Sequence, residues 1–196
     1  MKRVVDFVLS AFGLVVLSPL FLIIAVIVRL TSPGPAFFQQ LRVGRNGRSF
    51  NMLKFRTMIV LQDAEKGSFE AGSSAHVTRI GRVLRQTKLD ELPQLWNVLK
   101  GDMALVGPRP EVRKWVDAYP DHWDRILTVR PGITDPGAIE FRNEEDILTM
   151  QAEPETYYRN VILPRKLDLY EKYVQTRSFC GDLRILLRTV WAVIAR

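Results

Sequence analysis

An apolar run near the N-terminus constrains the fold more than any other feature of the chain. Residues 4–28 are apolar except at five positions, which are Asp6, Ser10, Gly13, Ser18 and Pro19. As one straight helix this run would extend about 37 Å, more than the roughly 30 Å hydrocarbon core of a bilayer. It also exceeds the apolar core of a secretory signal, and Arg29 to Pro33 contain no small-residue cleavage site. The sequence therefore predicts that this segment enters a membrane.

The Ser18-Pro19 pair lies near the middle of this run and leaves two topologies open. Pro19 has no N–H for the Val15 carbonyl, which costs about 3 kcal/mol inside a helix, although spanning helices tolerate such kinks. Residues 4–18 cover only about 22 Å as helix, so a sharp break would leave the turn inside the bilayer. Ser18 can donate to a carbonyl of the preceding turn, which limits the unsatisfied groups at such a break.

The charges around the segment bear on its orientation. Residues 7–62 contain no Asp or Glu but six Lys or Arg, which by the positive-inside rule favours a single pass with the N-terminus outside. A re-entrant segment would instead bring the basic side chains of Lys2, Arg3 and Arg29 together among lipid headgroups. The residues alone leave the spanning and re-entrant forms open.

Composition narrows the classes of partner and excludes several kinds of site. The formal charge of +7 and the pI near 9.8 indicate an anionic partner, which could be nucleic acid, phospholipid or a phosphorylated substrate. The single Cys180 excludes an internal disulfide framework, and His76 and His122 lack zinc-site spacing. The sequence also has no P-loop, dinucleotide-binding, zinc-protease or serine-hydrolase motif.

The rest of the chain reads as one mostly helical domain with one hairpin. Asn46-Gly47 separates two apolar runs, residues 37–43 and 50–55, and predicts a β-hairpin. Prolines predict rigid turns over residues 106–111 and 130–137. Residues 67–75 are rich in Gly and Ser and predict a loop. Helices are predicted over residues 57–66, 77–88, 93–100, 155–175 and 182–196, with Gly101 ending the third. The last could lie in a membrane interface or in the core.

Residues 79–103 carry the most informative polar pattern. Pro93 suits the first turn of a helix, so a helix is expected to begin near Leu89 or Asp90. Asp90 and Glu91 would then lie at a helix N-terminus, where free N–H groups stabilise carboxylates and also bind phosphate oxygens. Acidic residues are common at helix starts, so the pair alone does not identify a site.

Four basic residues precede this acidic pair at intervals of three: Arg79, Arg82, Arg85 and Lys88. Several of them can line the approach to Asp90, and arginine forks suit a diphosphate. A solvated helix face or a contact with anionic lipid explains the same stripe.

Four blocks of sequence carry a resemblance to a known family. They are Ser18-Pro19 in the apolar segment, GRNGRSFNMLKFRTM at 44–58, LDELPQLWNVLKGDMALVGPRPE at 89–111 and RPGIT at 130–134. Their order resembles that of the bacterial sugar transferases known as monotopic phosphoglycosyl transferases. The likeness covers nearly the whole chain, in the minimal form that lacks further transmembrane helices.

The resemblance implies an enzyme at the cytoplasmic face of the bacterial inner membrane. A sugar-1-phosphate would pass from a UDP-sugar to polyprenol (undecaprenyl) phosphate, releasing UMP and initiating glycoconjugate assembly. Asp90 would be the nucleophile that forms a phosphosugar–enzyme intermediate, and Glu91 with Asp90 would hold Mg²⁺. Carboxylates and phosphates repel, so the metal ion and guanidinium groups would neutralise their charge.

The resemblance also implies substrate-binding residues. Arg85 and Arg109 would lie near the phosphates, and Lys54 and Arg56, in the block at 44–58, would also bind substrate, as would Arg130. Pro108 and Pro110 would flank Arg109 in a rigid wall beside the nucleotide. After RPGIT many relatives continue with Gly and a Trp-Ala-Gln stretch, whereas residues 135–139 here read DPGAI, so the identity of the sugar stays open.

These observations give one overall expectation. The fold is mostly α with a small β-hairpin (α+β), in a membrane-associated monotopic domain with interfacial helices. Residues 1–30 form a re-entrant helix-break-helix, which the family's topology favours, and residues 31–196 form the cytoplasmic catalytic domain. The partners are a UDP-sugar, polyprenol phosphate and the lipid bilayer, with no nucleic acid; monomer and homodimer both remain open. The alternatives are a membrane-anchored phosphohydrolase that uses the same acidic pair and a non-catalytic scaffold for anionic lipids.

Overall fold

The N-terminal segment forms two helices with a bend between them. The structure, a computed structural model, describes residues 1–59, 76–141 and 143–194. Helix α1 (Lys2–Val16) and helix α2 (Ser18–Thr31) meet at Leu17 with a bend of 62°. The Ser18 hydroxyl donates to the Val15 carbonyl at 2.8 Å, and Pro19 lies in the first turn of α2. The predicted break and the predicted role of Ser18 are both confirmed.

No helix in the described part of the chain is by itself long and apolar enough to cross a bilayer, whereas the bent pair α1 and α2 meets the length and composition criteria together.

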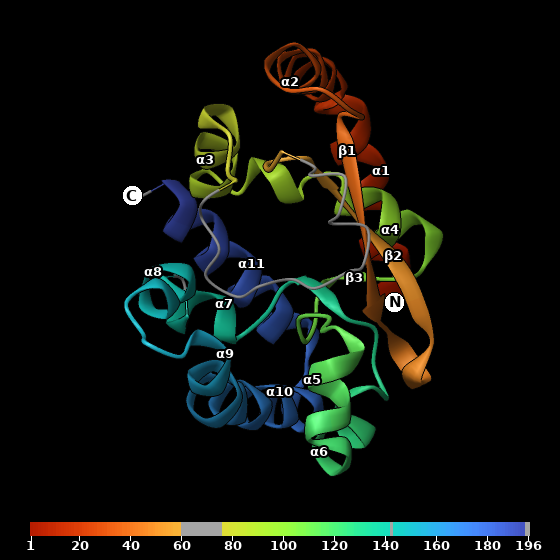
Figure 1. The fold of residues 1–196 in the computed structure, drawn as a ribbon. Coiled ribbons are helices and arrows are strands. Elements are labelled where there is room, and N and C mark those ends of the chain that lie inside the picture. Colours follow the sequence, from red (N-terminus) through yellow and green to blue (C-terminus); the bar gives the residue numbers. More distant parts are fainter. Residues whose placement is uncertain (60–75, 142, 195–196) are drawn as a thin grey trace.

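Helix α1 buries polar side chains and exposes apolar ones. It lies along helix α4 (Gln94–Lys100) (Figure 1). The two helices pack closely at Gly13, because a Cβ atom on this residue would lie 3.3 Å from Leu95 Cδ1. Asp6 and Ser10 are buried, and the exposed side chains include Val4, Val8, Phe12 and Val15. This is the reverse of the pattern in a water-soluble helix, where the apolar stripe faces the core.

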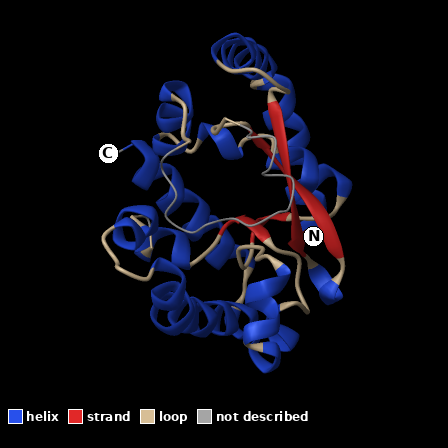
Figure 2. Ribbon diagram, in the orientation of Figure 1, coloured by secondary structure: helices blue, strands red, loops and turns tan. Residues whose placement is uncertain are grey.

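The predicted hairpin is confirmed. Strands β1 (Phe37–Val43) and β2 (Ser49–Phe55) pair antiparallel, from Phe37 opposite Phe55 to Val43 opposite Ser49 (Figure 2). A 3₁₀ turn, Arg45–Gly47, connects them, and its residues Asn46 and Gly47 have φ of 57° and 73°. Asparagine and glycine are the residues that adopt such positive φ values most readily, which explains why they close this turn.

A second, parallel sheet was not predicted. Strand β3 (Ala104–Val106) pairs with β4 (Gly132–Thr134). Strand β4 lies inside the predicted turn 130–137, and β3 ends at Val106, where the predicted turn 106–111 begins. Strands of three residues are too short to show the alternation of apolar and polar side chains that identifies longer strands. The neighbouring prolines also favour the prediction of a turn. The backbones approach closely, because a Cβ on Gly107 would lie 2.5 Å from the Arg130 carbonyl oxygen.

Helices make up most of the remaining structure. Helix α3 (Arg79–Gln86) matches the prediction for residues 77–88, and α4 ends as predicted at Gly101, whose φ is 95°. The later helices are α5 (Arg113–Ala118), α6 (Pro120–Ile126), α7 (Gly137–Glu140), α8 (Glu144–Thr149), α9 (Pro154–Tyr157), α10 (Leu163–Thr176) and α11 (Phe179–Ile194), with a π-helical turn, Tyr158–Ile162, before α10. The predicted helix 155–175 is therefore confirmed as a nearly continuous helical run.

The largest apolar core lies between α5, α6 and α10, around the buried side chains of Trp123, Leu167 and Tyr170. Helix α11 is not a core helix, since Leu183, Leu187 and Trp191 are 49%, 63% and 72% exposed. Of the two interpretations of this segment, the buried one is wrong.

The helix predicted over residues 57–66 is wrong where it can be compared. Thr57 to Ile59 are not helical, and Met58 instead forms a β-bridge with Val77. The rest of that helix and the whole loop predicted over 67–75 fall in residues 60–75, outside the described residues.

Candidate active site

Asp90 and Glu91 lie in a 3₁₀ turn, Leu89–Glu91, that precedes α4. A helix therefore begins at Leu89, as predicted, but it is a short 3₁₀ helix, and the α-helix α4 begins only after Pro93. Lys88 starts the turn with a positive φ of 59° and so reverses the chain after α3. Both carboxylates are buried, at 5% and 8% exposure. The turn thus brings two acidic side chains out of water at one point.

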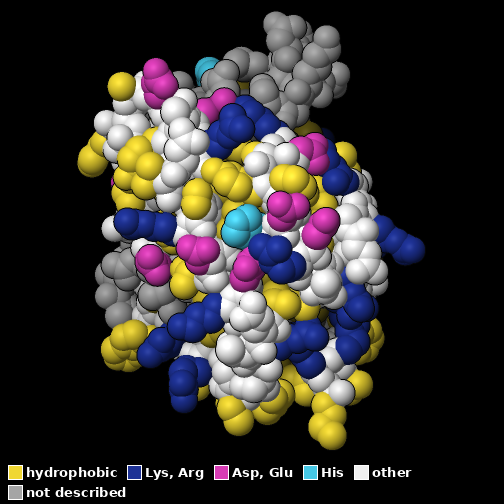
Figure 3. Space-filling view, turned by 90° about the horizontal axis from the view of Figure 1, so that it is seen from below, with side chains coloured by type: hydrophobic (Ala, Val, Ile, Leu, Met, Phe, Trp, Pro, Cys, Tyr) yellow, Lys and Arg dark blue, Asp and Glu magenta, His cyan; other side chains and the backbone are white. Residues whose placement is uncertain are grey.

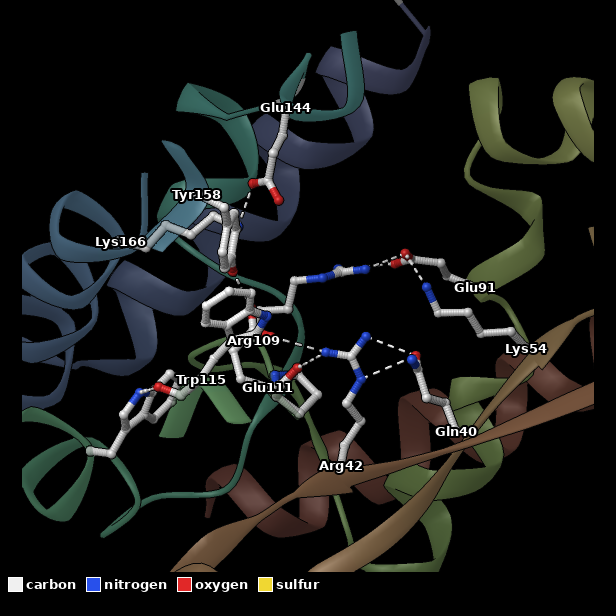
Figure 4. Close-up of polar contacts among 12 residues, drawn as sticks. Gln40, Arg42, Lys54, Glu91, Arg109, Glu111, Trp115, Glu144, Tyr158 and Lys166 are labelled. Carbon is white, nitrogen blue, oxygen red and sulfur yellow. Dashed lines mark hydrogen bonds and ion pairs between the residues drawn. The ribbon is translucent and has the colours of Figure 1, made fainter. Parts of the chain in front are cut away.

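Glu91 is held by two cations from distant parts of the chain. Lys54 Nζ, on β2, donates to Glu91 Oε1 at 3.1 Å, and Arg109, in the loop after β3, donates to both carboxylate oxygens (Figure 4). Burial raises the pKa of Glu91, but the charges of Arg109 and Lys54 outweigh burial and hold this pKa well below its usual range. Glu91 is therefore an ionised, fully paired carboxylate.

Asp90 is in the opposite situation. Its Oδ1 atom is buried and makes no hydrogen bond within the described part of the chain. Burial raises the pKa of Asp90, and the neighbouring Lys54 opposes this shift. A buried carboxylate oxygen without a partner costs free energy that a bound cation or an electrophilic phosphorus atom can recover. The pair thus combines one satisfied carboxylate with one available for a ligand.

A second group of charges lies behind the first. Arg42 Nη1 pairs with Glu111 Oε2 at 3.1 Å, and the Tyr158 hydroxyl donates to Glu111 Oε1 at 2.6 Å (Figure 4). Lys166 forms an ion pair with Glu144. These side chains come from β1, the loop before α5, the π-helical turn and α10, so the second group connects the hairpin to the helical core.

Sequence reasoning missed this second group. Arg42, Tyr158 and Lys166 belong to segments with no local motif, and Glu111 enters only as the last residue of the block at 89–111. Asp135, noted as a departure from the family pattern, is buried, and its carboxylate accepts the Gly137 N–H at 2.6 Å. Burial raises the pKa of Asp135, and the charge of Arg109 opposes this. Asp135 is therefore a second acidic group that acts on Arg109.

The structure does not bring every expected substrate-binding residue to this cluster. Arg56 instead donates to backbone carbonyls at the end of α2, those of Ser32 and Pro33 at 2.8 and 2.7 Å. Arg130 Nε donates to the Gly101 carbonyl at 2.8 Å. Arg85, in the last turn of α3, donates from Nε to Thr57 Oγ1 at 3.0 Å. Lys54 and Arg109 are thus the two expected cations that contact Glu91.

The two prolines beside Arg109 fix its backbone. The Pro108 carbonyl accepts the Gly132 N–H at 2.9 Å, and the Pro110 carbonyl accepts Arg42 Nη1 at 3.2 Å. The predicted rigid turn is confirmed in this loop. Its anchoring to β4 and β1 keeps the Arg109 backbone in place while the side chain reaches Glu91.

The chain is similar to known proteins over most of its length. The sequence pattern of the family described as bacterial sugar transferase matches residues 1–196. A UDP-glucose:undecaprenyl-phosphate glucose-1-phosphate transferase of Caulobacter vibrioides is 39% identical over 193 residues, which cover 96% of this chain and 68% of that protein.

Two further relatives differ in length and in name. A UDP-N-acetylgalactosamine-undecaprenyl-phosphate N-acetylgalactosaminephosphotransferase of Aeromonas hydrophila is 44% identical over 137 residues, which cover 68% of this chain and 32% of that protein. The exopolysaccharide production protein ExoY of Sinorhizobium fredii is 35% identical over 207 residues, covering 98% of this chain and 84% of that protein. The chain thus spans most of two of these relatives and about a third of the other. With a match over its whole length, the chain belongs to the bacterial sugar transferase family.

Proposed function

We propose that this protein transfers a sugar-1-phosphate from a UDP-sugar to polyprenol phosphate and releases UMP. Relatives named as UDP-sugar:undecaprenyl-phosphate transferases support the reaction class. The observation that carries the proposal is the buried acidic pair: Asp90 keeps an unpartnered oxygen beside Glu91, which Lys54 and Arg109 hold. Two cations beside one available carboxylate suit a diphosphate substrate.

The reaction proceeds in two displacements at one phosphorus atom. Asp90 Oδ1 attacks the phosphorus that bears the sugar, and the bond to the bridging oxygen breaks, so its electron pair leaves with UMP. An oxygen of polyprenol phosphate then attacks the acyl phosphate, and the Asp90 carboxylate leaves with the electron pair of its P–O bond. Splitting the transfer in this way replaces one difficult step with two easier ones. Lys54 and Arg109 stabilise the negative charge that develops on the phosphate oxygens.

The residues present fit Mg²⁺ as cofactor. In the described ranges no three His, Cys, Asp or Glu side chains come together as a metal cluster, so the protein offers the two carboxylates of Asp90 and Glu91. Mg²⁺ commonly binds one or two carboxylates and completes its shell with water and substrate phosphates. The unpartnered Asp90 oxygen agrees with this ligand set. The ion would neutralise phosphate charge during transfer.

The bent pair α1 and α2 serves as a re-entrant membrane segment on the cytoplasmic face of the bacterial inner membrane. A bend of 62° leaves an angle of about 118° between the axes of α1 and α2. If both helices, each about 22 Å long, enter the membrane at the same tilt, the bend at Leu17 lies only about 11 Å below the surface. That depth stays within one leaflet of the roughly 30 Å core. Both ends of the pair then return to the side on which residues 31–196 lie.

The distribution of exposed side chains supports this placement. Exposed apolar residues concentrate on α1, α2 and α11 and include Phe12, Leu22, Leu30, Leu187 and Trp191. The face in Figure 3, by contrast, mixes acidic and basic side chains across its middle, while apolar side chains project along its lower edge. Segments rich in exposed aliphatic and Trp side chains suit a lipid interface.

One assay separates the candidate functions. The protein in vesicles is given undecaprenyl phosphate, Mg²⁺ and each of a panel of UDP-sugars, and UMP and lipid-linked sugar are measured. The transferase releases UMP only when lipid acceptor and UDP-sugar are both present. Turnover without the lipid acceptor would identify a phosphohydrolase, and no release with any donor would favour a lipid-binding scaffold.

A second assay tests the topology. A cysteine is placed ahead of Met1 in a Cys180→Ser background, and an impermeant maleimide is added to either side of the membrane. The re-entrant form is labelled from the cytoplasmic side alone. Labelling from the periplasmic side would establish a spanning segment.

A further inference from the structure

Side chains from two helices reach one backbone carbonyl, that of Val106 at the end of β3, and a third helix holds both of them. Lys2 Nζ, at the start of α1, donates to this oxygen at 3.0 Å, and the Tyr173 hydroxyl of α10 lies 3.2 Å from it. Both side chains also contact Asp182 of α11: the Tyr173 hydroxyl reaches Asp182 Oδ1 at 2.7 Å, and Lys2 forms an ion pair with the same carboxylate. We call Lys2, Val106, Tyr173 and Asp182 the Val106 junction.

Lys2 is the donor on which the Val106 carbonyl depends. A phenol has one proton, and burial raises the pKa of Tyr173, so the hydroxyl stays protonated and donates through its shorter contact to Asp182. An ammonium group has three protons, so Lys2 can bond Asp182 and the Val106 carbonyl together. Arg3 likewise donates to the Val98 and Leu99 carbonyls, so the side chains of Lys2 and Arg3 both make hydrogen bonds within the protein.

The Val106 carbonyl lies at the start of the loop that carries Arg109. Gly107 N–H donates to the Thr134 carbonyl at 3.0 Å, and the space around Gly107 leaves no room for a side chain. The ring of Pro108 fixes the φ angle of this residue, and its carbonyl accepts a hydrogen bond from the Gly132 N–H. Between Val106 and Arg109 the chain therefore has little freedom to absorb a displacement.

We propose that Lys2 is a positioning residue for the active site: through the Val106 carbonyl it fixes the loop that aims the Arg109 guanidinium. Asp182 and Tyr173 hold the Lys2 ammonium group in place for this task. The inference rests on the proposed function, in which Arg109 binds substrate phosphate. It gives the first helix a part in substrate binding as well as in membrane attachment.

The test measures UDP binding to the full chain in vesicles, by calorimetry with Mg²⁺ present. Lys2→Met removes the donor and keeps the apolar stem, and we expect a dissociation constant about three- to tenfold higher, the size of one lost buried hydrogen bond. Lys2→Arg restores a donor for both partners and is expected to bind UDP within about twofold of the unmodified chain. Co-sedimentation with the vesicles checks that each variant still associates with lipid.

Two controls separate positioning from general loosening. Arg3→Met removes contacts between α1 and α4 without touching Val106, and Lys114→Met breaks an exposed ion pair with Glu155. Both are expected to leave UDP binding within about twofold, as for surface or remote changes. In an Arg109→Gln background, Lys2→Met should cause no further loss, because the side chain that it positions is absent.

Each other outcome contradicts the proposal. An unchanged UDP affinity in Lys2→Met, or an equal loss with and without Arg109, would overturn the positioning role alone. Should Lys2→Met fail to fold, Tyr173→Phe supplies the second variant, and it is expected to weaken UDP binding in the same direction by a smaller factor. If the unmodified chain bound no UDP, both the proposed function and this inference would fall.

Discussion

Arg109 occupies both carboxylate oxygens of Glu91, with Nη1 donating to Oε2 at 3.3 Å and Nη2 to Oε1. Lys54 adds a second contact to Oε1 at 3.1 Å. A metal ion that binds Glu91 must therefore compete with two cations of the protein. On the proposed function, substrate phosphates attract the same two cations, and we expect binding of the nucleotide to release the carboxylate for the metal.

This competition predicts that Mg²⁺ and UDP bind cooperatively. Mn²⁺, as a spectroscopic substitute for Mg²⁺, is expected to bind weakly to the free protein and at least several-fold more tightly when UDP is present. Arg109→Gln should raise the Mn²⁺ affinity of the free protein and reduce the effect of UDP. Arg113→Gln, which alters an exposed arginine bonded to the Gly47 carbonyl, is the matched control. Independent binding of Mn²⁺ and UDP would contradict the competition.

The proposed roles of the acidic pair predict different failures. Asp90→Asn should abolish turnover and also the trapping of a radiolabelled sugar phosphate on the protein, because a neutral amide is a poor nucleophile. Glu91→Gln should retain some labelling but need more Mg²⁺, since it removes a charged ligand. Labelled protein from Asp90→Asn would exclude Asp90 as the nucleophile, and an unchanged metal titration would remove Glu91 from the metal site.

The raised pKa of Asp90 predicts the acid limb of the pH profile. Only the ionised carboxylate attacks, so activity is lost as the pH falls through this pKa, at a higher pH than for an ordinary aspartate. The Lys88 charge lowers the pKa of Asp90, so Lys88→Asn should move the acid limb to higher pH. Asparagine suits the positive φ at this position. Lys100→Asn, at an exposed lysine paired with Asp102, should leave the limb unmoved.

The buried pair of Arg42 and Glu111 predicts a large effect on stability. Glu111→Gln leaves the Arg42 guanidinium buried without its counter-charge, and the expected loss is about 3–5 kcal/mol in the free energy of unfolding. Urea unfolding followed by tryptophan fluorescence measures it. Lys114→Met, which removes an exposed ion pair, should cost about 1 kcal/mol or less. Equal losses in the two variants would show that the buried pair contributes no more than the exposed one.

Sequence reasoning succeeded where one residue type has a local physical consequence. Pro19 removes an N–H, Asn46-Gly47 accepts positive φ, and Gly101 ends α4, so the break, the hairpin and the helix end could all be predicted. The acidic pair and the helix start at Leu89 were also located, but the separate 3₁₀ turn was not, because it depends on the positive φ of Lys88.

The remaining features depend on contacts between distant residues. Lys54 and Arg56 lie in the same family block, yet Lys54 pairs with Glu91, whereas Arg56 donates to the Ser32 carbonyl after α2. Nothing in the sequence of the block predicts which of the two side chains reaches the acidic pair. The helices α5 and α6 have six and seven residues, too few to show a clear period. The strands β3 and β4 exist only because they meet each other.

The Val106 junction also fixes an order of events during synthesis. Lys2 and Asp182 are separated by 180 residues, so at roughly 5–20 residues per second the ribosome adds the second about 9–36 s after the first. During that interval α1 exists without the carboxylate that holds its lysine, whereas its apolar side chains are already available to lipid. On the proposed topology the nascent chain is attached to the membrane before the Arg109 loop is secured. On the proposed role of Lys2, substrate binding by Arg109 therefore matures only after α11 has left the ribosome and closed the junction.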